Sequence, residues 1–180
     1  NRVIDKKEVI SMFYIKNHKD EKIIKFSLEF YRNKSIAEEL FESDIYDAEL
    51  YIHDDDVKRI RFNDLKIGKN KIIDLGIDDI PLNKVDIKET KNKKILNSYA
   101  IDAGRLNFTS ATVTIQAKGT ELYKCKEWNF TEQKCHGNWE KIMSLIPGKE
   151  YNITITQDDP GFAEIGLASI NTNKSIYHPN

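Results

Sequence analysis

The stretch Lys22–Arg32 reads KIIKFSLEFYR and decides the fold class. Apolar residues occupy every second position from Ile24 to Phe30, and polar residues stand between them. A period of two is typical of a β-strand that turns one face to the core and the other to water. We therefore expect a half-buried strand here. If the same alternation recurs along the chain, the protein is expected to be all-β.

The alternation does recur, most clearly in Thr112–Ala117 and Tyr151–Thr156. Short strands separated by turn residues are typical of a β-sandwich and not of a parallel α/β sheet. Ile36–Phe41 instead has helical spacing, Asp54–Asp56 forms a turn, and Lys66–Leu75 is expected to be a hairpin around Gly68. The other strands predicted are Val9–Ile15, Asp47–His53, Val57–Phe62, Leu122–Trp128 and Asn138–Leu145.

The length of 180 residues is enough for one large domain or two modules of immunoglobulin size. Residues 83–95 are rich in Lys, Asn and Asp and poor in large apolar groups, as expected of a connection between modules. We therefore predict one or two immunoglobulin-like β-sandwich modules. Residues 1–95 form the N-terminal one, and residues 96–180 form the C-terminal one with a disulfide-bridged loop.

The charge balance disfavours two classes of partner. Lys and Arg number 28, Asp and Glu number 29, and the net charge is −1. Such a chain lacks the positive field that attracts nucleic acid or an anionic membrane. It also contains no run of the roughly 20 apolar residues that a membrane helix needs. We predict neither nucleic-acid binding nor membrane insertion within this segment.

Five Asn-x-Ser/Thr sequons indicate N-glycosylation. Chance pairing of 15 Asn with 18 Ser and Thr residues over 180 positions predicts about 1.5 such motifs. A sequon is an acceptor only in an exported protein, where the attached sugar faces solvent. Asn152 falls on the polar side of the predicted strand Tyr151–Thr156. The candidate glycosylation sites are Asn33, Asn107, Asn129, Asn152 and Asn173.

Cys125 and Cys135 are the two cysteines of the chain, and nine residues separate them. This spacing suits a disulfide across the base of a short loop, and two free thiols are the alternative. A zinc site fits poorly, because His136 and its neighbour Cys135 rarely reach one tetrahedral ion. A disulfide together with sequons indicates an oxidising setting, so we expect an extracellular or cell-surface location.

A set of motifs runs through the second half of the chain, from residue 99 to residue 164. They are Tyr99–Asp102, Leu106–Thr109, Ala117–Gly119, Leu122–Cys125, Trp128–Phe130, Cys135, Gly137, Trp139, Pro147-Gly148, Tyr151 and Asp159–Glu164. With these motifs the segment resembles a module that recurs in large secreted or surface-anchored archaeal proteins. The resemblance implies a surface location and an immunoglobulin-like sandwich. It brings no catalytic residues, and the first 95 residues have no such resemblance.

Trp128 and Trp139 flank the predicted disulfide, so they are candidates for a platform on which sugar rings stack. The alternative is that they pack over the bridge, as a small sandwich requires. The Asp54–Asp56 turn offers oxygen ligands for Ca²⁺, but consecutive aspartates cannot all face one ion. Motifs for nucleophilic catalysis, zinc hydrolysis and phosphate binding are absent from the sequence. We therefore predict a protein without a cofactor that is not an enzyme.

These observations lead to one functional hypothesis and one alternative. We expect a glycosylated structural component of the cell surface: a surface-layer, adhesin or extracellular-filament subunit. It would associate with its own copies or with neighbouring surface proteins through strand edges, and Val9–Ile15 is the strand expected to complete a neighbour's sheet. The alternative is a carbohydrate-binding module that uses Trp128 and Trp139.

Overall fold

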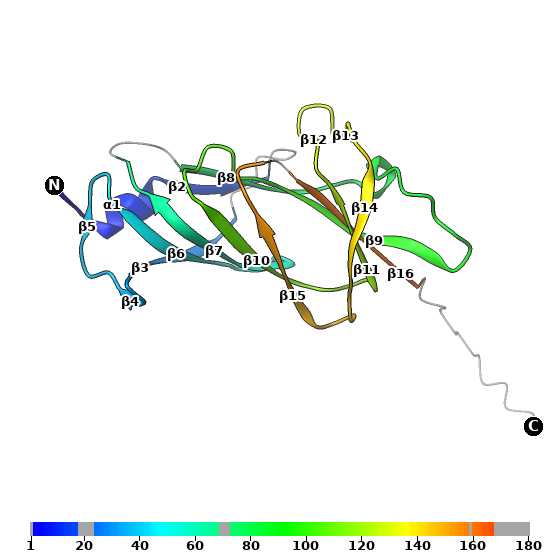
Figure 1. The fold of residues 1–180 in the computed structure, drawn as a ribbon, viewed down its shortest axis with the longest axis horizontal. Helices are drawn as coiled ribbons and strands as arrows, with labels where there is room; N and C mark the ends of the chain where they lie inside the picture. The colour runs from blue at the N-terminus through cyan, green and yellow to red at the C-terminus, as the bar shows by residue number, and fades with distance from the viewer. Residues whose placement is uncertain (1, 18–23, 69–72, 159, 168–180) are drawn as a thin grey trace, which may run out of the picture.

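The computed structural model describes residues 2–17, 24–68, 73–158 and 160–167. Strands account for 56% of the described residues and helices for 6%, which confirms the all-β prediction. Two sheets of six strands each dominate the molecule, which is elongated (Figure 1). Smaller pairs join β1 (Val3–Ile4) to β5 (Leu40–Phe41) and β12 (Trp128–Asn129) to β13 (Lys134–Cys135).

Sheet I is antiparallel throughout and has the order β15-β10-β7-β6-β3-β4. Its strands alternate between buried and exposed residues, as the sequence pattern predicts: in β15, Ile153 is buried and Asn152 is exposed. The exposed face is therefore polar. The strands are β3 (Phe26–Arg32), β4 (Ser35–Ile36), β6 (Ile45–Ile52), β7 (Val57–Lys66), β10 (Ser110–Gln116) and β15 (Glu150–Ile155).

Sheet II has the order β14-β11-β16-β9-β8-β2. Its pairs are antiparallel except for β2 and β8, which run parallel. A 3-10 turn, Leu82–Lys84, lies in the connection between β8 and β9. The strands are β2 (Phe13–Lys16), β8 (Ile73–Asp79), β9 (Lys93–Asp102), β11 (Glu121–Cys125), β14 (Trp139–Ser144) and β16 (Gly161–Leu167).

The main hydrophobic core combines side chains from both sheets. Phe30, Ile60 and Val113 of sheet I belong to the same buried cluster as Ile101 and Phe162 of sheet II. Apolar side chains at alternate positions of two facing sheets leave water together, and this burial is the main driving force for such a fold. The architecture is thus a β-sandwich, and an immunoglobulin-like connectivity stays a prediction.

The predicted module boundary at residues 95 and 96 does not separate two sandwiches. Sheet I joins β10 and β15 to β3, β6 and β7, and sheet II joins β9 to β8. Residues 83–95 are not a linker either, because Val85 and Ile95 are buried in a second apolar cluster. Alternation identifies strands but not their partners, and this is why the sequence pattern placed a boundary inside a shared core.

The predicted strand Val9–Ile15 is wrong in its first half. Residues Lys6–Ser11 form helix α1, whose N-terminus is capped by Asp5, with a carboxylate oxygen that accepts from the Lys7 N–H at 2.9 Å. The strand β2 follows and pairs in parallel with β8 of the same chain. The capping residue Asp5 favours a helix at Lys6–Ser11, and this local signal outweighs the short alternation of apolar residues from Val9 onward.

Two further local predictions need correction. Ile36–Phe41 contains no helical turn, because Ser35–Ile36 and Leu40–Phe41 are short strands. Lys66–Leu75 is not a hairpin, because β7 ends in sheet I while β8 lies in sheet II. This connection therefore passes from one sheet to the other. The strands predicted at Asp47–His53 and Val57–Phe62 and the turn between them are present.

Candidate functional site

The segment from Cys125 to Trp139, which carries both cysteines and both tryptophans, covers part of the outer face of sheet II. The central strand β16 is buried on both sides: Phe162 faces the main core, and its neighbour Ala163 faces the second apolar cluster. A surface strand would leave one of these faces in water, so this sheet is covered by additional layers. The cluster contains Ile80, Val85, Ile95, Ala100, Cys125, Trp128, Ala163 and Ile165.

The predicted disulfide between Cys125 and Cys135 is present, and none of the described cysteines is free. It joins the end of β11 to the β12–β13 pair, in which Trp128 lies opposite Cys135. Chain-entropy arithmetic for so short a loop gives a stabilisation of about 2.5–3 kcal/mol. The bridge thus holds the loop that carries Trp128 against sheet II.

Trp128 packs against sheet II and is only 4% exposed. A Cβ atom at Gly161 would lie 3.2 Å from its ring, so the glycine makes room for the indole. The ring centroids of Trp128 and Trp139 lie 6.1 Å apart, with 55° between the planes. A sugar platform needs an open aromatic face, which Trp128 does not offer. The packing interpretation of this residue therefore fits the geometry.

Three of the predicted glycosylation sites present their side chains to solvent. Asn33 lies in the turn between β3 and β4, Asn107 precedes β10, and Asn152 lies in β15; all three are exposed. Asn129 is half-buried in the disulfide loop, where its side-chain oxygen accepts from the Glu132 N–H at 2.8 Å. Asn173 lies outside the described residues. An exposed Asn satisfies the steric condition for a glycan.

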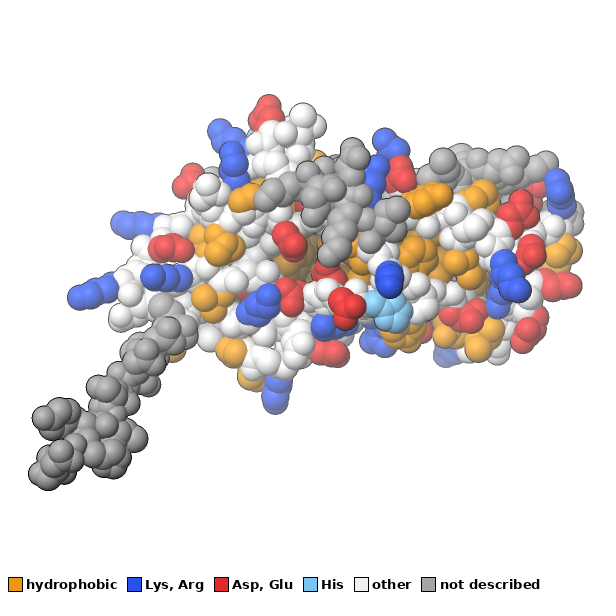
Figure 2. Space-filling view, turned by 180° about the vertical axis from the view of Figure 1, so that it is seen from behind, with side chains coloured by type: hydrophobic (Ala, Val, Ile, Leu, Met, Phe, Trp, Pro, Cys, Tyr) orange, Lys and Arg blue, Asp and Glu red, His pale blue; other side chains and the backbone are white. Residues whose placement is uncertain are grey.

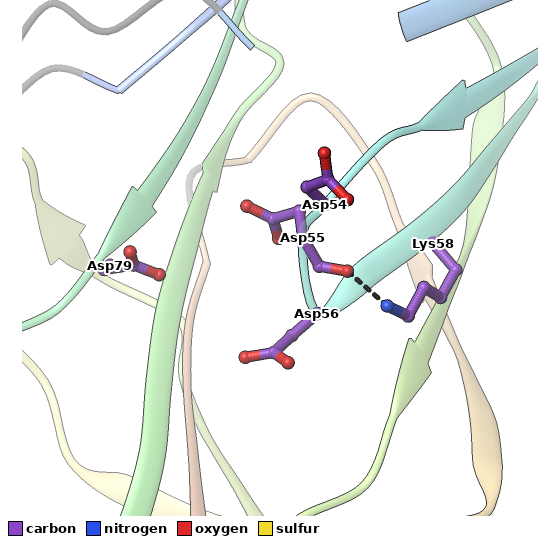
Figure 3. Close-up of a pocket in the computed structure, with 5 residues that line it drawn as sticks. All are labelled: Asp54, Asp55, Asp56, Lys58 and Asp79. Carbon is purple, nitrogen blue, oxygen red and sulfur yellow. Dashed lines mark hydrogen bonds between the residues drawn. The ribbon is translucent and has the colours of Figure 1, made fainter. Parts of the chain in front are cut away.

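The turn Asp54–Asp56 lines a shallow cleft of about 290 Å³ together with Lys58 and Asp79 (Figure 3). Its carboxylates point in different directions (Figure 3). Asp56 forms an ion pair with Lys118 at 2.7 Å, and the Asp55 carbonyl accepts from Lys58 Nζ at 2.6 Å. The hydrogen bond to Asp56 raises the pKa of Lys118. Among the described residues, no group of three or more His, Cys, Asp or Glu side chains is arranged to hold a metal ion.

The buried carboxylate of Glu164 joins the two sheets. The sequence pattern did not single out this residue. Glu164 of β16 is 0% exposed. Its Oε1 accepts from the Tyr151 hydroxyl at 2.7 Å, and its Oε2 accepts from the N–H groups of Lys118 and Gly119 at 2.6 and 2.9 Å. The sequence does carry a signal: Glu164 shares the core-facing register of Phe162, where an apolar residue is expected.

The phenol groups beside this carboxylate extend the network. The hydroxyl oxygens of Tyr99 and Tyr151 lie 2.9 Å apart. Burial raises the pKa of Tyr151, and the nearby Tyr99 and Glu164 raise it further. Burial also raises the pKa of Tyr99. Both phenols are therefore held in the neutral form, and the cluster links β15 of sheet I to β9 and β16 of sheet II.

No protein-family model, curated protein or solved structure matches the chain. Within the described residues, no helix is long and apolar enough to cross a membrane.

Proposed function

We propose that this protein is an N-glycosylated structural subunit of the cell surface that assembles through the edges of its β-sheets. The observation that carries the proposal is the disulfide between Cys125 and Cys135, which fixes an outer layer on a sandwich that already has a large core. Stable disulfides belong to oxidising, extracytoplasmic compartments. N-glycosylation of the five sequons would also require an exported location.

The position of the sequons supports the same location. Asn33, Asn107 and Asn152 are exposed and come from three separate parts of the chain. Sugars at these positions would stand in solvent without disturbing the core. Figure 2 shows acidic and basic side chains interspersed over one face of the molecule, which suits a protein without a strongly charged partner.

The polar interior supports a structural role. Glu164 accepts hydrogen bonds from Tyr151 and from two backbone N–H groups, so its carboxylate is fully used in joining the sheets. A buried polar network whose members have hydrogen-bond partners stiffens the framework around it. The proposal includes no catalytic step.

The route to assembly differs from the one expected from the sequence. Val9–Ile15 was expected to complete a neighbour's sheet, but its strand portion, β2, pairs with β8 of its own chain. Its outer side is also used, because the Ile15 carbonyl accepts from the Ile24 N–H at 3.0 Å. Association through an edge therefore requires another strand, for which unpaired backbone groups are the template.

Mass spectrometry of native protein tests the proposed location. We expect glycan masses on peptides containing Asn33, Asn107 or Asn152, and alkylation of Cys125 and Cys135 only after reduction. Protease treatment of intact cells should remove the protein, while a cytoplasmic marker is spared. A bare polypeptide with two reactive thiols, protected inside the cells, would contradict the proposal.

A further inference from the structure

Within the described residues, the strand orders of the two sheets end in β15 and β4 in sheet I and in β14 and β2 in sheet II. Beyond the two residues that β4 covers, β3 also lies at the edge of sheet I, where its charged Glu29 forms an ion pair with Lys6. The four end strands differ in how they are protected. Three of them carry features that oppose pairing with another chain. Strand β4 has two residues. The outer side of β2 is occupied, because its Ile15 carbonyl accepts from the Ile24 N–H. Strand β14 contains a bulge at Ile142, and the adjacent Lys141 is exposed and charged. Short, covered, bulged and charged edges discourage association.

Strand β15 has none of these features from Tyr151 to Ile155. Its six residues pair with β10 in one continuous register without a bulge, and Glu150 is its single charged residue. Buried and exposed residues alternate along its whole length. A regular strand of this kind is the form of edge that accepts a further strand.

The hydrogen-bonding pattern shows which residues of β15 face this open edge. The Lys149 carbonyl accepts from the Ala117 N–H of the β10 segment at 2.9 Å, so Lys149 faces β10. Backbone groups of successive residues point to opposite sides of a strand. Tyr151 and Ile153 therefore also face β10, whereas Asn152 and Thr154 turn their N–H and C=O groups outward.

We propose that β15 pairs antiparallel with β15 of a second copy of this chain, with the two-fold axis at Ile153, and that a glycan on Asn152 prevents this pairing. The inference rests on the proposed function, of which it names the partner and the regulation. Sheet I of one copy then continues into sheet I of the other. The contact is isologous, because the same strand serves both copies.

The residues of β15 match one another in this register. Asn152 lies opposite Thr154 of the second copy, so the outward backbone groups of both residues pair and their polar side chains share the outer face. Tyr151 lies opposite Ile155 on the core side. The exposed Glu150 lies opposite the exposed Thr156 of the second copy. Apolar groups thus meet apolar groups on the core side, and polar groups meet polar groups on the outer face.

The sequon at Asn152 occupies the middle of this contact. Its side chain is exposed on the outer face, and its oxygen accepts from the Thr114 hydroxyl of β10 at 2.7 Å. Opposite residues in an antiparallel pair have Cβ atoms about 4.5–5.5 Å apart. A sugar chain on Asn152 needs this space and meets its equivalent from the second copy. Glycosylation of Asn152 therefore keeps the edge unpaired.

Proline substitution tests the pairing on protein from a host without N-glycosylation. Asn152→Pro removes an outward N–H, and edge strands tolerate proline at such positions. Thr154→Pro does the same at the next outward residue, and Asn152→Gln is the matched control that keeps the N–H. Analytical ultracentrifugation should show dimers for wild type and Asn152→Gln. Both proline variants should dimerise at least tenfold more weakly while melting close to wild type.

Ile153→Pro serves as the opposite control, because the Ile153 N–H faces β10 and its loss should lower the melting temperature. A proline variant at Asn152 or Thr154 that folds and dimerises like wild type would overturn the inference. A wild-type chain without glycans that stays monomeric at all accessible concentrations would also overturn it. Neither result would contradict the proposed location, because that is tested separately on the glycans and thiols of native protein.

The regulatory part is tested in a host that performs N-glycosylation, with occupancy of Asn152 measured by intact mass. Wild type carrying a glycan at Asn152 should be monomeric. Asn152→Gln, which retains the sequons at Asn33 and Asn107, should be dimeric. Equal dimerisation of the two glycosylated proteins would overturn the regulatory role of Asn152.

Discussion

At the scale of single residues, Glu164 connects the two sheets through its hydrogen bonds. It is fully buried in the core-facing register of β16 and receives three hydrogen bonds, one from a side chain and two from the backbone. A buried carboxylate is costly to desolvate, but removal of its acceptor oxygens is costlier still, because the Tyr151 hydroxyl and two backbone N–H groups lose an acceptor. Glu164 is thus required once the surrounding donors are in place.

Glu164→Ala should lower the free energy of unfolding by about 3–5 kcal/mol, because each donor left without its acceptor costs about 1–3 kcal/mol. Glu164→Gln keeps one oxygen for the two backbone N–H groups, and its NH₂ can donate to the Tyr151 oxygen, so it should lose about 1–2 kcal/mol. Urea denaturation of both variants measures the difference. Equal losses would contradict the network.

The raised pKa values of Tyr99 and Tyr151 predict instability at alkaline pH. A phenol whose pKa is higher in the folded than in the unfolded protein contributes stability below pH about 10, and this is lost as the pH rises further. Each buried phenol should lower the free energy of unfolding by about 1.4 kcal/mol per pH unit above 10.

Urea denaturation between pH 8 and pH 11 measures this slope. Tyr99→Phe should reduce it, and Tyr14→Phe is the control because Tyr14 is 41% exposed. A free energy of unfolding that stays constant over this range would show that the two phenols ionise without unfolding the protein.

At the scale of elements, the disulfide loop acts as an outer layer that depends on one bond and one aromatic anchor. Cys125 belongs to β11 and is buried, whereas Cys135 lies in the short strand β13. The loop between them shares its apolar cluster with the connection that carries Val85. Because this cluster is separate from the main core, its loss should expose the outer face of sheet II without separating the two sheets.

The double substitution of Cys125 and Cys135 by Ser should lower the free energy of unfolding by about 2.5–3 kcal/mol. Hydrogen exchange should accelerate in residues 126–138 and remain slow in β6 and β7. Trp128→Ala is a comparison that removes the anchor but keeps the bond. Uniformly faster exchange in both sheets would show that the outer layer is part of the main core.

The sequence predicted those elements whose signal is local. Strand alternation located β3, β6, β7, β10 and β15, and cysteine spacing predicted the disulfide. Helix α1 was missed, although Asp5 before Lys6–Ser11 is a capping signal. The pairing of β8 with β9 across the 80–92 connection was also missed, because partner choice depends on contacts between distant residues that alternation does not encode.

At the scale of the whole molecule, the strands of both sheets are interleaved in sequence. Strand β10 lies between β7 and β15, and β9 lies between β8 and β16. Each sheet therefore needs segments from both halves of the chain, and the main core contains side chains from both halves. Such an arrangement favours one cooperative unfolding transition over two.

Differential scanning calorimetry should accordingly give a single transition whose calorimetric and van't Hoff enthalpies agree. Fragments 1–95 and 96–180 should each lack cooperative melting, since each would expose a sheet with missing strands. Mixing the two fragments is the useful control, because association would restore the missing pairs. Two resolved transitions in the intact chain would instead support independent modules.

The position of β16 has a consequence for how the protein is made. It is the last strand described along the chain, yet it lies between β9 and β11 and is covered on both faces. A ribosome releases the chain from its N-terminus, so sheet II keeps a gap until Leu167 has emerged. The nascent chain therefore cannot complete its core before that point. A product that stops short of Gly161 is expected to be degraded instead of persisting as a smaller folded protein.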